Sequence, residues 1–400
     1  MTSEATGCII SGVVALIATY IATFPSIKLA HKIGAVVPPD ERRVHKVPLP
    51  DLGGAALFIG LLFGLLAGAF FSGLSQIYSI IPQILGIVIG GGAIFFIGLV
   101  DDRIDMSPPA KLAGQVLSAM ILYFAGDTMY WFKIPFAAFI VLSPTITPLI
   151  TAIWVIMIEN AINLIDGLDG LAAGIVAIAS GSFAIYAIKL IDVGLIGSSN
   201  PGPLLAAICC GMTLGFLPNN FHPSKIMMGD SGALLLGFLM AAATSVVGGR
   251  TPDTSGETYF FFAPLFIPLI ILGVPILDVA FAIIRRTYTR EGFAYADKGH
   301  LHHRLLRLGH GQRRAVAILW LWTVVLSGLV LYPVFDPNGN IVVPFGIAVL
   351  LVSLYTWFRP GLGKEGAKPD KNEINIKRLR SENKASVATQ KDKLLEDYLE

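Results

Sequence analysis

The sequence predicts an all-α polytopic membrane protein with about eleven transmembrane helices. Three observations support this prediction: 54% of the 400 residues are hydrophobic, only 14% are charged, and the mean hydropathy is +0.71. Soluble domains contain about 25% charged residues, so the chain lacks the polar shell that several cytosolic domains would need. These figures exclude a cytosolic enzyme, a disordered chain and a disulfide scaffold. The three cysteines, Cys8, Cys209 and Cys210, lie in apolar runs, and we expect them to be reduced and structural.

The predicted spans are apolar runs that approach the roughly 17 to 25 residues needed to cross the hydrocarbon core as a helix. In chain order they cover residues 8–27, 53–71, 80–100, 110–125, 146–158, 171–190, 203–217, 231–247, 259–284, 315–332 and 341–358. Between the fourth and fifth spans lies segment 129–147, where Pro135, Pro144 and Pro148 bracket two apolar stretches with β-branched residues. We expect a small extracytoplasmic hairpin there rather than a span.

The placement of Lys and Arg predicts the orientation, because short cytoplasmic loops are enriched in both residues. With an odd number of spans and the N-terminus outside, all 29 Lys and Arg residues except Lys133, Lys189 and Arg250 fall on the inner side. The seven histidines lie in the same inner loops. Residues 1–5 have no basic region, so the first run is expected to be an anchor rather than a removable signal peptide.

Two regions follow from this pattern. Residues 1–358 are expected to form one integral-membrane domain, and the charged segment 359–400 a cytoplasmic tail. The inner loops expected to carry the chemistry are 28–52, 101–111, 159–170, 218–230 and 285–314.

The loop after the third span contains the acidic pair Asp101 and Asp102, followed by Ser107-Pro108 and Lys111. Paired acids at a membrane boundary are costly unless a cation holds them, and Mg²⁺ bridging phosphates is one such partner; a solvated loop is the alternative. Ser107 is expected to cap a helix that has proline at its first position. Lys111 then lies in the first turn, where the helix dipole disfavours a cation, so an anion-binding role explains this lysine better than solvation.

The loop after the fifth span combines two amides, Asn160 and Asn163, with two carboxylates, Asp166 and Asp169. The amides share a helix face, and each acid precedes a glycine on a tight turn. Such oxygen ligands suit Mg²⁺ better than zinc or copper. Turn formation alone would explain Asp169, but not Asn163 in its apolar stretch. Asp230, just before the eighth span, is predicted to be either a helix cap or a second metal ligand from another helix.

The longest inner loop ends with His300, His302, His303 and Arg304. Zinc is one interpretation of three histidines in four positions, yet no cysteine and no HExxH helix accompanies them. Histidines beside arginine are better suited to binding phosphate or sugar oxygens, and a plain surface loop is the remaining alternative. Asp278, inside the ninth span, is a candidate for substrate contact or for pairing with a loop cation.

Taken together, the clusters predict a Mg²⁺-dependent phosphoryl-transfer site, at which the protein mainly positions groups and neutralises charge. The bilayer suggests a lipid as one substrate, and a phosphate-bearing molecule from the cytosol as the other. The alternative of another class is a lipid-linked sugar or nucleotide-sugar transporter. A transporter should place polar residues near the bilayer midplane, whereas these acids lie at span ends. A structural scaffold would leave the clustered acids unexplained.

Four motifs occur in order: DDxxD from Asp101, NAINLIDGLDGLAAG from Asn160, MGDSG from Met228 and HLHHRLL from His300. Their order resembles the polyprenyl-phosphate N-acetylhexosamine-1-phosphate transferases, the family that includes WecA, TagO and MraY, and the similarity extends to residues 43–54. The resemblance implies transfer of N-acetylglucosamine 1-phosphate from UDP-N-acetylglucosamine to undecaprenyl or decaprenyl phosphate, with release of UMP. It also implies a multi-pass protein of the bacterial inner membrane, with its active site facing the cytoplasm and no nucleic-acid partner.

The same resemblance implies roles for individual residues. Asn163 and Asp230 would bind Mg²⁺, with Mn²⁺ as the alternative cation, and Asp101 and Asp102 would be the catalytic pair. Lys111 would hold the pyrophosphate. The remaining substrate-binding candidates would serve the uridine, sugar and phosphates: Asn160, Asp166, Asp169, His300, His302, His303 and Arg304. A phosphate monoester is already largely dianionic at pH 7, so which acid is the base, and whether the lipid phosphate attacks directly, stay open.

The last histidine loop separates two branches of this family. Members that transfer a phospho-N-acetylmuramoyl-pentapeptide carry three consecutive histidines there, whereas this chain has His300-Leu301-His302-His303-Arg304. This favours the N-acetylglucosamine branch and leaves the pentapeptide transferase as the alternative. The resemblance favours a homodimer. It implies a first membrane step of envelope polysaccharide synthesis and leaves lipopolysaccharide, teichoic acid and arabinogalactan open.

Overall fold

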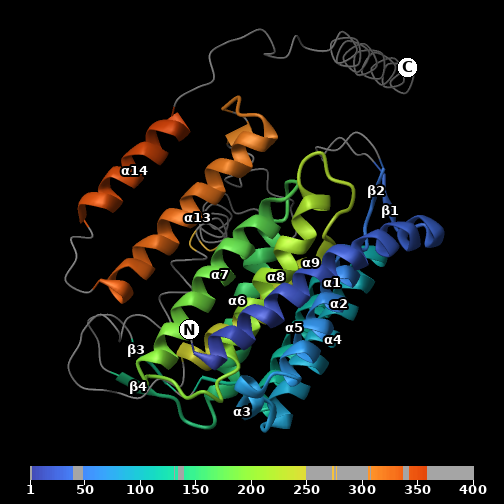
Figure 1. Ribbon diagram of the computed structural model, residues 1–400. Coiled ribbons are helices and arrows are strands. Elements are labelled where there is room, and N and C mark those ends of the chain that lie inside the picture. The colour runs from blue at the N-terminus through green and yellow to red at the C-terminus, as the bar shows by residue number, and fades with distance from the viewer. Residues whose placement is uncertain are drawn as a thin grey trace, which may run out of the picture.

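The computed structural model describes residues 2–38, 48–129, 131–133, 139–248, 308–336 and 342–357, with single positions at 273, 276, 305 and 306. Across these residues the long helices run side by side as a bundle, and α13 and α14 lie along one edge of it (Figure 1). The long helices are α1 (Ser3–Ile33), α2 (Gly53–Ala69), α4 (Ile81–Ile104), α5 (Pro108–Phe124), α6 (Thr147–Ile165), α7 (Leu171–Asp192), α8 (Gly202–Asn220), α9 (Gly229–Gly248), α13 (Gln312–Phe335) and α14 (Val342–Trp357).

The all-α membrane class is confirmed. Each predicted span overlaps one of these helices, except 259–284, which lies outside the described residues apart from the single positions 273 and 276. Seven described helices are long and apolar enough to cross a membrane, or eight if a bent pair counts as one span. In that pair, α2 is followed after a 98° bend by the short η1 (Ser72–Leu74) and α3 (Ser75–Tyr78). Helices α5, with 17 residues, and α14, with 16, match predicted spans but are shorter than the seven candidate membrane helices.

Two short antiparallel ladders connect the helices. In the first, β1 (Val36–Val37) pairs with β2 (Leu49–Pro50) and joins the end of α1 to the start of α2. In the second, β3 (Trp131–Lys133) pairs with β4 (Phe139–Val141) inside the segment expected to form a hairpin. Its place on the outer side of the membrane stays a prediction.

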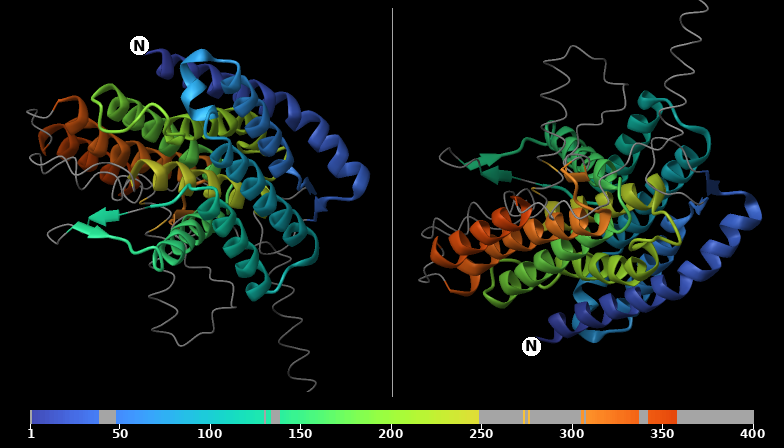
Figure 2. Two further views of the ribbon diagram at one scale, coloured as in Figure 1. Left: turned by 90° about the horizontal axis from the view of Figure 1, so that it is seen from below. Right: turned by 90° about the horizontal axis from the view of Figure 1, so that it is seen from above.

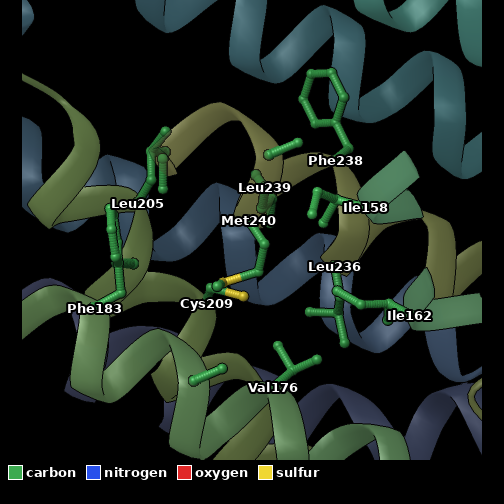
Figure 3. Packing of buried hydrophobic residues seen from close by; sticks show 14 of the residues in the cluster. Ile158, Ile162, Val176, Phe183, Leu205, Cys209, Leu236, Phe238, Leu239 and Met240 are labelled. Carbon is green, nitrogen blue, oxygen red and sulfur yellow. The ribbon is translucent and has the colours of Figure 1, made fainter. Parts of the chain in front are cut away.

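Helix α9 is the centre of the bundle. It packs against α2, α4, α6 and α8, and Figure 2 shows the bundle from below and from above, with α9 in yellow-green among the other helices. As a result 94% of its apolar window is buried, compared with 44% for α1 at the periphery. Figure 3 shows apolar side chains from α6, α7, α8 and α9 filling one core, among them Ile158, Phe183 and Met240. Residues at the N-terminus of α9 therefore have fixed neighbours on several sides.

Small residues set how closely α1 and α8 approach. A Cβ atom added at Gly211 of α8 would lie 1.9 Å from the carbonyl oxygen of Gly12 in α1, so the two backbones are in direct contact. Such contacts replace the hydrophobic effect as a source of association between helices in lipid. Gly12 and Gly211 thus allow close packing of α1 against α8.

Candidate active site

Four helix ends meet at one end of the bundle and bring the predicted acids together. Asp101 and Asp102 lie in the last turn of α4, Lys111 in the first turns of α5, Asn163 in the last turn of α6, and Asp230 at the start of α9. Successive membrane helices alternate in direction, so these ends share one face of the bundle. Residues separated by up to 129 positions in the chain are in direct contact there.

Lys111 links two of the acids. Its ammonium lies 2.8 Å from the Asp101 carboxylate and also donates to the Asp230 carboxylate. The Asp101 side chain is 10% exposed and that of Asp230 is 34% exposed, so Asp230 is the acid that an incoming ligand can reach. Asp101 is further held by the backbone N–H of Met106, which donates to it at 2.7 Å. Lys111 therefore pairs with one member of the acidic pair, Asp101, and with Asp230 of another helix, while its predicted role toward pyrophosphate stays a prediction.

Asp102 is used differently, because its carboxylate caps helix α9. The backbone N–H groups of Asp230 and Ser231 donate to its two oxygens at 2.7 and 3.1 Å. A negative charge at a helix N-terminus satisfies otherwise unpaired N–H groups and interacts favourably with the helix dipole. Asp102 of α4 thus fixes the position of Asp230, which the sequence alone did not indicate.

Asn163 reaches the same acid from a third helix. Its amide nitrogen donates to Asp230 at 2.8 Å, which turns the polar end of Asn163 toward the cluster. Asp166, directly after α6, lies close enough to the other acids for their charges to affect its pKa. Burial raises the pKa of Asp166 well above its ordinary value, and the negative charges of Asp230 and Asp51 raise it further. Three carboxylates, those of Asp101, Asp102 and Asp230, thus lie around the single ammonium of Lys111.

Asp51 is a neighbour of the site that the sequence analysis did not single out. It follows β2, and its backbone pairs with Met227 just before α9 in an isolated parallel bridge. Gly229 adopts a φ of +69°, and a Cβ atom there would lie 2.5 Å from Asp51 Oδ1 and 2.7 Å from Asp102 Oδ2. The two carboxylates thus flank the glycine of MGDSG. The sequence feature that could have identified Asp51 is its position between Pro50 and Gly53-Gly54 in an inner loop.

Asp169 belongs to a separate group on this face. Its carboxylate contacts His222 Nδ1 at 2.6 Å and accepts a hydrogen bond from the Ser224 hydroxyl at 3.0 Å. These contacts tie the loop after α6 to the loop after α8. The role of Asp169 toward uridine stays a prediction.

Other predicted site residues lie elsewhere. Asn160 points one turn deeper, where its amide donates to Gln115 Oε1 at 3.2 Å and to the Ile156 carbonyl at 2.8 Å. Ser107 is the N-cap of α5 and Pro108 its first residue, as expected, but the Ser107 side chain makes no capping hydrogen bond. The candidates of the histidine loop and the ninth span, His300, His302, His303, Arg304 and Asp278, fall outside the described residues.

Comparison with known proteins identifies the family. The family model described as Glycosyl transferase family 4 matches residues 84–248. The decaprenyl-phosphate N-acetylglucosaminephosphotransferase of Mycobacterium tuberculosis strain H37Rv is 35% identical over 351 residues, covering 85% of this chain and 86% of the relative. The chain belongs to glycosyl transferase family 4.

Two further relatives of this glycosyl transferase family 4 chain come from other bacteria. A protein of Bacillus subtilis strain 168, named probable undecaprenyl-phosphate N-acetylglucosaminyl 1-phosphate transferase, is 36% identical over 319 residues, covering 80% of this chain and 83% of its own. The undecaprenyl-phosphate alpha-N-acetylglucosaminyl 1-phosphate transferase of Salmonella typhi is 29% identical over 356 residues, covering 83% and 86%. The range matched by the family model runs from α4 to the end of α9, so it contains the clustered acids and Lys111 but not Asp51.

Proposed function

We propose that this member of glycosyl transferase family 4 transfers N-acetylglucosamine 1-phosphate from UDP-N-acetylglucosamine to a polyprenyl phosphate and releases UMP. The observation that carries the proposal is the ammonium of Lys111 between Asp101 and Asp230, at the end of a membrane bundle. A cation beside the N-terminus of α5 offers a place for phosphate groups, and both substrates carry them. The relatives above, which cover most of the chain, are named as transferases acting on decaprenyl or undecaprenyl phosphate.

Mg²⁺ fits the donor set of this site. The side chains near Asp230 offer carboxylate and amide oxygens, which hard cations prefer, and the crowded negative charges around Asp166 favour a cation. Among the described residues, no three Asp, Glu, His or Cys side chains converge as a complete metal site. Mg²⁺ is commonly held by one or two carboxylates together with substrate phosphates. We therefore assign Asp230 and Asn163 to a Mg²⁺ ion that is completed by the nucleotide.

The side chains of this protein would divide the work of transfer. An oxygen of the lipid phosphate attacks the β-phosphorus of UDP-N-acetylglucosamine, a new P–O–P bond forms, and the bond to the UMP oxygen breaks. Bound Mg²⁺ would neutralise negative charge on the diphosphate. Lys111 would stabilise the charge that builds up on the phosphate oxygens, while Asp102 keeps Asp230 in place through the cap of α9. Because the attacking phosphate is already largely dianionic, Asp102 need not act as the base.

The reaction is assigned to the cytoplasmic side of the membrane. Lys28 and Lys32 near the end of α1, and Arg103 and Lys111 beside the acids, lie at the same end of the bundle as the site. Lys189 lies near the other end of α7. This asymmetry is the one that inner loops show, and it supports entry of the nucleotide sugar from the cytosol.

The proposal is tested with the full-length protein purified in detergent, supplied with UDP-N-acetylglucosamine, undecaprenyl phosphate and Mg²⁺. We expect UMP release and a lipid-linked sugar only when all three are present. Chelation with EDTA should stop the reaction, and added Mg²⁺ should restore it. Faster turnover of the muramoyl-pentapeptide nucleotide would assign the protein to the other branch. Uptake of intact nucleotide sugar into vesicles without UMP release would contradict the transferase function.

A further inference from the structure

A second polar layer lies beneath the candidate active site. Glu159 of α6 is 0% exposed and lies one turn below Asn163. Its Oε1 lies 3.2 Å from the Ser118 hydroxyl of α5, two turns below Lys111, and this hydroxyl shares its proton between Glu159 and the Gln115 carbonyl of its own helix at 2.8 Å. Beside this link, Asn160 of α6 donates to Gln115 of α5 at 3.2 Å. The helices that present Lys111 and Asn163 to Asp230 are therefore joined a second time, deeper in the bundle.

Helix α9 covers this layer from the third side. A Cβ atom added at Gly237, two turns below Asp230, would lie 2.4 Å from the Cα atom of Glu159. The backbone of α9 therefore lies directly against α6 at the position of the buried acid. The same three helices thus contribute to both layers, with Lys111, Asn163 and Asp230 above and Ser118, Glu159 and Gly237 below.

The folding stability of the bundle does not explain why a carboxyl group is buried at position 159. Burying a carboxyl group is costly, and well-packed apolar residues in place of buried ionic groups are often neutral or stabilising. Ser118 lies on the same helix as Lys111, and Glu159 lies on the same helix as Asn163, which connects the lower layer to the site. Residues that hold reacting groups in place act through such supporting contacts, and an error of about 1 Å can cost about 100-fold in rate.

We propose that Glu159 is a positioning residue, which through Ser118 holds α5 at a fixed height against α6, so that Lys111 and Asn163 reach Asp230 together. A slip of α5 along α6 would separate Lys111 from Asp230 without unfolding the bundle. This inference rests on the proposed function, since the rate of transfer is what the positioning serves.

Glu159→Leu, Glu159→Gln and Ser118→Ala provide the test in the full-length protein. Leucine fills similar space without a hydrogen-bond acceptor, so we expect kcat for UMP release to fall about tenfold, with the KM for UDP-N-acetylglucosamine within about twofold. The melting temperature should stay the same or rise. Glu159→Gln keeps an acceptor for Ser118 and should retain at least about a third of kcat. Ser118→Ala should lower kcat about threefold, and adding it to Glu159→Leu should cost nothing further, because both remove one link.

The matched control is Ser245→Ala in α9, whose buried hydroxyl bonds to the Ala242 carbonyl of its own helix at 2.9 Å. It should leave kcat unchanged. A Glu159→Leu protein with normal kcat, or effects of Ser118→Ala and Glu159→Leu that multiply, would overturn the positioning role. If Glu159→Leu does not fold, Ser118→Ala decides: lowered kcat at constant KM supports the role, and normal kcat contradicts it. Wild-type protein that releases no UMP contradicts the proposed function itself.

Discussion

Asp230 and Asp102 lie next to each other in the site, but their contacts give them different tasks. The Asp230 carboxylate is 34% exposed and is approached by Lys111 and Asn163. Both oxygens of Asp102 accept backbone N–H groups of α9. Replacing each acid by its amide should therefore affect activity and stability in different proportions.

We expect Asp230→Asn to lower UMP release by at least about 100-fold and to leave the melting temperature unchanged, because it removes charge at the ligand side of the site. Asp102→Asn should lower both, since the new amide group would face an N–H donor at the cap, and losing a cap costs about 1–2 kcal/mol. Asp192→Asn, an exposed acid at the far end of α7, is the control and should behave as wild type. Equal loss of stability in both site variants would show that the acids do not have separate tasks.

The residue types of the site were largely predictable from the sequence, but their contacts were not. Lys111, Asn163 and Asp230 stand out because polar side chains beside apolar segments are costly unless they have a binding partner or a function. Asp51 did not stand out, because its proximity to Gly229 depends on a bridge between segments far apart in the chain. Asn160 shares a helix face with Asn163, yet their partners differ because they lie at different depths along α6.

At the scale of elements, the turn into α9 depends on a glycine whose conformation and surroundings both exclude a side chain. Gly34, the C-cap of α1, has a nearly identical φ of +71° but no atom within 4 Å of a Cβ position. Comparing the two glycines separates backbone strain from contact with the carboxylates.

Gly229→Ala should lower UMP release at least about tenfold, because the methyl group would push Asp51 and Asp102 away from their positions. Gly34→Ala should cost about 1–2 kcal/mol of backbone strain and leave UMP release within about twofold of wild type. Thermal melting and UMP release, measured on both variants, give the comparison. Similar activities for the two proteins would mean that the crowding at Gly229 has no effect on the site.

The spans themselves followed from apolar runs, because a helix in lipid must satisfy its backbone hydrogen bonds internally. The sequence did not indicate where α1 ends: this helix continues through the basic residues after the apolar run, to Ile33. Nor did it show the 98° bend after α2, which falls between two apolar segments. Hydropathy marks which segments enter lipid, whereas bends and helix ends depend on contacts with neighbours.

For the whole molecule, the orientation in the membrane is the property that the sequence predicts and labelling can measure. Cys8 and Cys209 are buried and Cys210 is partly buried, so the wild-type protein serves as the background control. Asp192→Cys should react with a membrane-impermeant maleimide in intact cells, and Lys225→Cys only after permeabilisation. The opposite labelling pattern would place the acids outside and would rule out access by a cytosolic nucleotide sugar.

The central position of α9 also bears on how the protein is made. The four helices that surround α9 precede it in the chain, so they are synthesised first. Helix α9 is therefore inserted after the helices that it packs against. Its length and apolar composition are those of a membrane span, and packing against other helices replaces its lipid contacts. Asp230 lies at the start of α9, so a nascent chain that ends before α9 contains Asp102 and Lys111 but not the acid that they contact. We therefore expect catalytic competence to appear late in biogenesis.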